Sequence, residues 1–160
     1  MAIWFECKVR YDKMQENGAI KKVNEPYLVD ALSFTEAEAR IIEEITPFIS
    51  GEYTISSEKK TKISEIFWDE TGDRFYLVKV LFITIDEKTA VEKKSASLIL
   101  VQASDFKNAL ENFTKGMKDT MADYEIASIT ETPIMDVYPA DLSGKKPQDT
   151  PKPQEATDQQ

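Results

Sequence analysis

Apolar and polar side chains alternate along residues 4–11, which is the period of a β-strand with one face on a core. The turn Asn17-Gly18 follows, and this dipeptide favours a tight hairpin into a second strand. Pro26 lies in that second strand, and a proline there indicates an edge, a bulge or a break. The opening of the chain is therefore predicted to be a β-hairpin.

A helix is predicted directly after the hairpin. Ser33 with Glu36 forms a capping box, and Pro47 and Gly51 mark the end of the helix. Apolar residues recur between them at intervals of three and four, as in an amphipathic helix. This stripe consists of Phe34, Ala37, Ile41, Ile45 and Phe48. Two further strands are predicted at 53–57 and 63–68.

The second half of the chain shows the same series of elements. Residues 75–85 are apolar on both faces, which is typical of a central strand, and 95–102 is expected to pair back on it. Ser104 or Asp105 then caps a second helix that runs to about Met121. Its predicted buried stripe consists of Phe106, Ala109, Phe113 and Met117. Strands at 124–130 and 134–138 complete the order ββαββ-ββαββ.

The two halves match one another at a shift of 71 or 72 positions, with 4–67 laid over 75–138. Any two such stretches share apolar periodicity, so the shared order of unlike features carries more weight. Phe34 corresponds to Phe106, and we expect both to be core residues facing the sheet. The period exceeds that of solenoid units, so the match favours a pseudo-symmetric domain over an array.

Length and composition predict one α+β domain over residues 1–138, since 160 residues with 41% hydrophobic content can bury a core. From Pro139 the chain becomes rich in Pro and Gln, so 139–160 is predicted to be a disordered tail. The net charge of −9 argues weakly against a broad phosphate-binding surface. The single Cys7 and the lack of long apolar runs favour a cytoplasmic protein outside membranes.

Residues that carry common chemistry are scarce. Histidine is absent, which removes the commonest general base and metal ligand. No glycine-rich phosphate loop is present, and Cys7 is predicted to be a small buried hydrophobe. We therefore expect neither enzymatic activity nor a cofactor or metal, and a small-molecule enzyme is the weakest alternative.

Aromatic and basic side chains recur on the predicted sheets. Trp4 and Lys8 share a strand face, and the repeat puts Phe75 and Lys79 at the matching places. Aromatic rings interleaved with lysine can stack the bases of single strands. The simpler alternative is that the lysines face solvent and Phe75 belongs to the core. The candidate nucleic-acid residues are Trp4, Lys8, Arg10, Lys21, Lys22, Phe75, Lys79, Lys93 and Lys94.

Four stretches, at 4–11, 25–40, 101–103 and 123–129, resemble a small family of uncharacterised proteins of Bacteroidota and their phages, carried as a domain of unknown function. The resemblance covers about residues 3–139. It implies a bacterial or phage protein of the cytosol, and it implies no activity, cofactor or catalytic residue. The ββββα order read from Tyr53 is also similar, in permuted form, to the Whirly and PUR folds, which bind single-stranded nucleic acid.

The sequence thus predicts an α+β fold with antiparallel sheet, two helices and a tandem ββαββ pseudo-repeat. The leading hypothesis is a non-enzymatic binding or adaptor protein with single-stranded nucleic acid as its ligand. The alternative is a structural or interaction module that acts with itself or with a phage or host protein.

Overall fold

The computed structural model describes residues 2–140 of the chain, and these residues have an α+β fold with the predicted order of elements. The elements are β1 (Trp4–Met14), β2 (Ile20–Asp30), α1 (Phe34–Ile45), a 3-10 turn η1 (Thr46–Phe48), β3 (Tyr53–Lys60), β4 (Ile63–Phe67), β5 (Arg74–Ile85), β6 (Glu92–Ala103), α2 (Phe106–Gly116), β7 (Asp123–Thr132) and β8 (Val137–Tyr138). The predicted tail lies outside the described residues from 141 onward.

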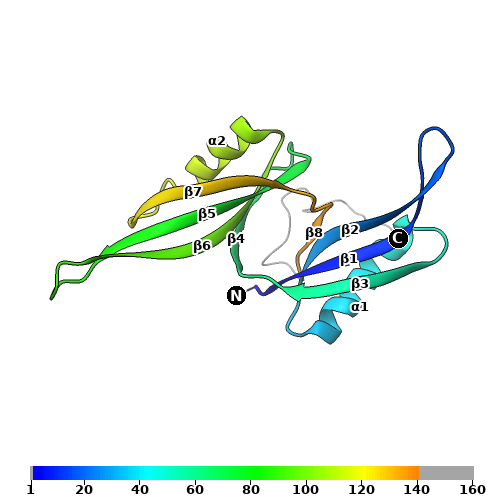
Figure 1. The fold of residues 1–160 in the computed structure, drawn as a ribbon, viewed down its shortest axis with the longest axis horizontal. Helices are drawn as coiled ribbons and strands as arrows, with labels where there is room; N and C mark the ends of the chain where they lie inside the picture. The colour runs from blue at the N-terminus through cyan, green and yellow to red at the C-terminus, as the bar shows by residue number, and fades with distance from the viewer. Residues whose placement is uncertain (1, 141–160) are drawn as a thin grey trace, which may run out of the picture. The chain divides into compact units, whose positions relative to one another are not determined.

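The described chain separates into two compact units (Figure 1). Unit 1 consists of residues 2–61 and 133–140, and unit 2 consists of residues 62–132. Each unit has one four-stranded sheet, in the order β3-β1-β2-β8 in unit 1 and β4-β6-β5-β7 in unit 2. In each unit one helix packs on one face of the sheet.

The fourth strand of each sequence half belongs to the sheet of the other half. β4 pairs with β6 at Leu98–Val101, and β8 pairs with β2 at Leu28 and Val29. Both pairings are parallel, whereas the others are antiparallel, so the sheets are mixed and not wholly antiparallel as predicted. Matched elements occupy matched places in the two sheets, and a gene duplication as the origin of this match stays a prediction.

The helix starts follow the predicted capping chemistry. Ser33 Oγ accepts a hydrogen bond from the Glu36 amide at 3.1 Å, and Glu36 Oε1 accepts one from the Leu32 amide at 2.7 Å. In α2 the cap is Asp105, whose Oδ1 accepts from the Asn108 amide at 2.8 Å. These bonds satisfy amides that the first helical turn leaves without intrahelical partners.

Two predictions about the helices are wrong. α2 ends at Gly116 and not near Met121, which is 97% exposed. Phe34 and Phe106 are not core residues, because they are 52% and 56% exposed. Each helix begins at its phenylalanine, so the ring lies at the end of the buried stripe and only its edge meets the sheet.

The two cores contain the remaining predicted stripe positions except Phe48, which is 78% exposed because α1 ends at Ile45 and Phe48 lies in η1. Residues Cys7, Val29 and Ile41 are buried between sheet and helix in unit 1, which confirms the prediction for Cys7. In unit 2 Val78, Val101 and Phe113 form the corresponding core. β5 lies between β6 and β7, as its apolar character predicts. The opposite, helix-free faces of the sheets carry most of the predicted binding residues.

Candidate functional site

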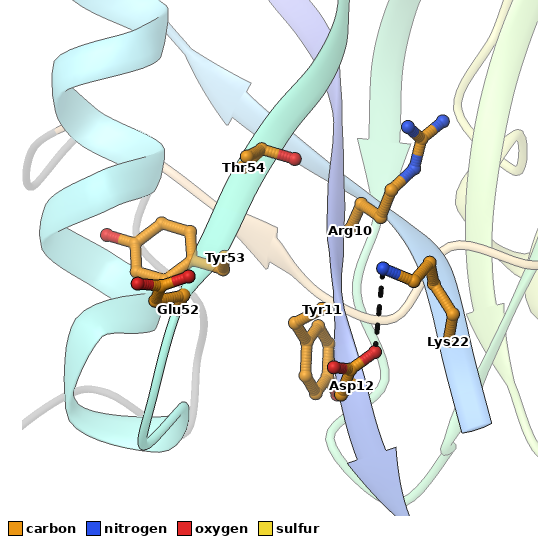
Figure 2. Close-up of a pocket in the computed structure, with 7 residues that line it drawn as sticks. All are labelled: Arg10, Tyr11, Asp12, Lys22, Glu52, Tyr53 and Thr54. Carbon is orange, nitrogen blue, oxygen red and sulfur yellow. Dashed lines mark ion pairs between the residues drawn. The ribbon is translucent and has the colours of Figure 1, made fainter. Parts of the chain in front are cut away.

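A hollow of about 150 Å³ opens at the end of unit 1 where β1 and β3 meet, and Figure 2 shows its lining. It brings together two predicted basic residues and two tyrosines from neighbouring strands. The lining residues are Arg10, Tyr11, Asp12, Lys22, Glu52, Tyr53 and Thr54. Tyr11 is paired directly with Tyr53, and both rings pack on the core on the helix side, whereas Arg10 and Lys22 extend to the other face.

Most polar groups of this hollow have partners within the protein. Lys22 Nζ lies 3.7 Å from Asp12 Oδ1, an ion pair that is marked in Figure 2. The Tyr11 hydroxyl donates to Glu25 Oε1 at 2.7 Å, and burial together with this carboxylate raises the pKa of Tyr11. Tyr53 shares a hydrogen bond with Thr46 at 3.2 Å.

Arg10 is the basic group of the hollow that is left for a ligand. Within residues 2–140 its guanidinium has no hydrogen bond and no ion pair, and Figure 2 shows it extending away from the Asp12–Lys22 pair. An unpaired guanidinium presents a fork of donors that matches a phosphate or a carboxylate. The hollow can therefore hold an anionic group at Arg10.

The other predicted lysines of unit 1 divide between the two faces of its sheet. Lys8 and Arg10 alternate with the buried Cys7 and Val9, so they lie on the helix-free face. Lys22 is paired with Asp12 and lies on that face too. Lys21 is paired with Lys13 and lies on the helix side.

Unit 2 repeats this division. Lys79 and Lys94 lie on the helix-free face, because Lys79 alternates with the core residue Val78 and Lys94 is paired with Ile83. Lys93 is paired with Thr84 and lies on the helix side. Lys94 Nζ is bound to Glu125 Oε1 at 3.0 Å, so part of this charge is neutralised.

The two aromatic residues predicted to stack on bases are both buried. Trp4 is 4% exposed and Phe75 is 3% exposed. Their carbonyl oxygens accept hydrogen bonds from the hydroxyl groups of Thr61 and Thr132. Neither ring has a free face in this conformation, so the basic residues and these rings do not form one surface.

The repeated lysine pairs have a structural explanation. The outer edge of β2 is paired by β8 only at Leu28 and Val29, so Lys21-Lys22 lies on a free stretch of edge within the described chain. Lys93-Lys94 lies likewise outside the part of β6 that β4 pairs. Lysines on free edges oppose pairing with the strands of other molecules.

Sequence reasoning missed a second hollow, of about 490 Å³, in unit 2. It lies between the end of β4 and the last turns of α2, and its residues come from two segments. They are Ile66, Phe67, Trp68, Asp69, Asn112, Lys115 and Gly116. A signal was available in Trp68, because a tryptophan that directly follows a strand and precedes a polar turn is commonly half exposed.

Residues 2–140 contain no cluster of three or more acidic, cysteine or histidine residues arranged to hold a metal ion. None of the helices in this described range has the length and apolar character needed to cross a membrane. The described chain is thus an α+β protein of two units. The sheet of each unit contains one strand from the other half of the sequence, and each unit has a hollow on its surface.

Residues 3–140 match the model of a family described as a domain of unknown function, DUF4494, and the chain belongs to this family. No curated protein and no solved structure matches the chain. The family assignment confirms the predicted resemblance and carries no activity. The bacterial or phage origin stays an expectation.

Proposed function

We propose that the protein is a non-enzymatic binding protein of the cytosol that takes single-stranded nucleic acid on the helix-free face of its sheets. The observation that supports this proposal is the unpaired Arg10 guanidinium, which lies with Lys8 and Lys22 on the helix-free face of the unit 1 sheet and lines the hollow at its end. An unpaired guanidinium with neighbouring lysines is a surface that can hold the phosphates of a single strand. Tyr11 and Tyr53 pack on the core on the helix side, so the contacts proposed on the helix-free face are with phosphates and not with stacked bases.

The distribution of charge supports a ligand on this face. Four glutamates of α1 lie on the helix, which covers the other face of the sheet: Glu36, Glu38, Glu43 and Glu44. The helix-free face carries Lys8, Arg10 and Lys22, with Glu6 and Asp12 between them. Such a mixed face predicts weak binding that is strongest at low salt.

Fluorescence anisotropy with labelled single-stranded DNA and RNA tests this proposal. The double variant Arg10→Ala/Lys22→Ala should weaken binding about 10-fold or more, since it removes the two cations of the hollow. The variant Lys88→Ala/Lys118→Ala is the control, because it removes the same charge from exposed positions elsewhere. Equal binding by both variants, or no binding by the parent protein at low salt, would contradict the proposal.

A second candidate function is self-association, and a separate observation favours it. Met14 and Ile20 are paired at the tip of the β1–β2 hairpin and are 71% and 65% exposed. The repeat shift takes them to Ile85 and Val91, which are 65% and 53% exposed at the β5–β6 tip. Each hairpin tip thus exposes two apolar side chains, although Ile85 is paired with Glu92 and not with Val91, and a second copy can meet these tips with its own.

Analytical ultracentrifugation over a wide concentration range tests this second candidate. We expect the parent protein to associate as its concentration rises, and Met14→Ser/Ile85→Ser to stay monomeric. The control Met121→Ser removes an apolar side chain of similar exposure away from the tips. A parent protein that stays monomeric throughout would rule out association through the tips.

A further inference from the structure

We propose that the hollow beside Trp68 in unit 2 is a binding site for a small aromatic carboxylate. It is separate from the hollow at Arg10 and does not depend on the proposed function. Its volume of about 490 Å³ lies within the range that small-molecule sites commonly have. The residues that line it provide both an aromatic wall and a small set of unused polar groups.

The aromatic wall is held in place by close packing. Phe67 lies against α2 at Gly116, where an added Cβ would come within 2.5 Å of the phenylalanine ring. The ring of Phe67 also packs on that of Phe113, with centroids 6.0 Å apart. Trp68 follows Phe67 and is only partly buried, so its indole can contact a planar ligand.

Some polar groups of this hollow already have hydrogen-bond partners within the protein, and others do not. Asn112 Nδ2 donates to Asp69 Oδ2 at 2.8 Å and to the Gln102 carbonyl at 3.0 Å. The other oxygen of Asp69 accepts from the amide and hydroxyl of Thr71 at 3.0 and 2.6 Å. These bonds lower the pKa of Asp69, so the carboxylate is ionised, and both of its oxygens have hydrogen-bond partners.

Three groups have no hydrogen bond and no salt bridge among residues 2–140: the Lys115 ammonium, whose charge acts on Asp69 only at longer range, the Trp68 indole N–H and the amide oxygen of Asn112. The Lys115 ammonium and the Trp68 indole N–H are donors, and the positive charge of Lys115 favours an anionic oxygen as the acceptor. The fixed negative charge of Asp69 in the same hollow disfavours a ligand with several negative charges. A single carboxylate on an aromatic ring fits both conditions.

At the corresponding position of unit 1, a protein side chain fills the space between helix and strand end. The repeat shift of 72 pairs Asn112 with Arg40 on α1. Arg40 Nη2 donates to the carbonyl oxygens of Tyr138 and Pro139 at 3.3 and 2.7 Å, at the end of β8. The long side chain of Arg40 bridges helix and strand end, whereas the shorter Asn112 turns to Asp69 and leaves the space open.

NMR of the full-length protein tests the site. The chain has two tryptophans, so its spectrum contains two indole N–H signals, and Trp68→Phe identifies the one that belongs to Trp68. Phenylacetate is the probe, 2-phenylethanol is the neutral analogue, and AMP is the probe with more negative charge. We expect a saturable shift of the Trp68 signal with phenylacetate, and dissociation constants about 10-fold or more higher for the other two.

The variant Lys115→Gln separates a binding role from a structural one. It should raise the dissociation constant for phenylacetate about 10-fold or more, because it removes the charged donor while keeping a similar length. Lys118→Gln is the matched control, and it should leave binding and stability unchanged. An unmoved Trp68 signal at millimolar phenylacetate, an equal response of both variants, or tighter binding of AMP or 2-phenylethanol would overturn the proposal.

Discussion

Thr61 donates a hydrogen bond from its hydroxyl group to the carbonyl oxygen of Trp4 at 2.8 Å. The repeat shift of 71 takes this pair to Thr132 and Phe75, which form the same bond, also at 2.8 Å. Each threonine is the last residue of its stretch before the chain passes into the other unit. The two bonds therefore hold the chain in place at the points where it leaves one unit for the other, before β4 and before β8.

Replacement of these threonines by valine tests that role. Thr61→Val and Thr132→Val keep the shape of the side chain and leave a carbonyl with one donor fewer, so each should lower the free energy of unfolding by about 0.5–1.5 kcal/mol. Urea denaturation measures the change. Thr114→Val on the exposed face of α2 is the control, and an equally small effect at all three positions would contradict the anchoring role.

The phenylalanines at the helix starts should contribute less than buried residues. Phe34 meets Phe5 edge-on with centroids 5.0 Å apart, and Phe106 meets Tyr76 in the same way at 6.5 Å. Phe34→Ala and Phe106→Ala should each cost about 1–2 kcal/mol, since an aromatic pair is worth roughly 0.5–1.5 kcal/mol beyond partial burial.

Phe113→Ala provides the comparison, because Phe113 is fully buried. It should cost about 3–5 kcal/mol as it opens a cavity in the core of unit 2. Urea denaturation of the three variants under one set of conditions gives the order. A loss at Phe34 or Phe106 as large as that at Phe113 would mean that the rings are buried in solution.

The order of elements could be predicted from the sequence because each element carries its own signal. The capping pair Ser33 and Glu36 marks a helix start, and the apolar run from Phe75 marks a central strand. These signals act over a few residues, so they are visible without knowledge of the fold.

The exchange of β4 and β8 could not be predicted, because a short strand does not encode its partner. Residues 63–67 carry apolar side chains only at Ile63, Ile66 and Phe67, and so short and irregular a pattern does not distinguish the edge of β2 from that of β6. For the same reason the burial of Trp4 was missed: its strand pattern sets the face but not what covers that face. The hollow at Trp68 depends on this exchange, since β4 supplies one wall.

Gly72 is predicted to be intolerant of any side chain. An added Cβ would lie 2.5–2.7 Å from backbone atoms of Ala103, which cannot move without shifting β6. Its carbonyl also accepts from the buried Gln102 side chain at 3.0 Å. Gly72→Ala should therefore cost about 1–3 kcal/mol through overpacking.

Thermal unfolding followed by the fluorescence of Trp68 in a Trp4→Phe background measures this effect in unit 2. Gly18→Ala, followed by the fluorescence of Trp4 in a Trp68→Phe background because Gly18 lies in unit 1, is the control, since nothing lies near its Cβ and only its positive φ of 87° opposes alanine. That strain should cost about 1 kcal/mol. A Gly72→Ala protein as stable as its parent would show that β6 yields easily at Ala103.

Unit 1 should lose stability in alkali. Burial and neighbouring carboxylates raise the pKa of Cys7 from 9.0 to about 12 and that of Tyr27 from 10.0 to about 12. Burial first, and then nearby carboxylates, also raise the pKa of Tyr11 and Tyr138. All four groups belong to unit 1.

The sign of the effect follows from proton linkage. Above pH 9 the unfolded chain loses protons that the folded unit keeps, so stability is complete below the unfolded pKa values and falls as the pH rises toward 12. Single-tryptophan variants follow the units separately, with Trp4 reporting unit 1 and Trp68 reporting unit 2. We expect the Trp4 signal to change at lower pH than the Trp68 signal.

Cys7→Ala in the Trp68→Phe background is the test of cause. Removing the thiol should weaken the pH dependence of unit 1 between pH 9 and 10, where an unfolded cysteine ionises before the tyrosines do. Cys7 should also resist alkylation at pH 8, because only the thiolate reacts and burial disfavours it. Rapid labelling of folded protein at that pH would show that Cys7 is accessible, and an unchanged alkaline transition would assign the effect to the tyrosines alone.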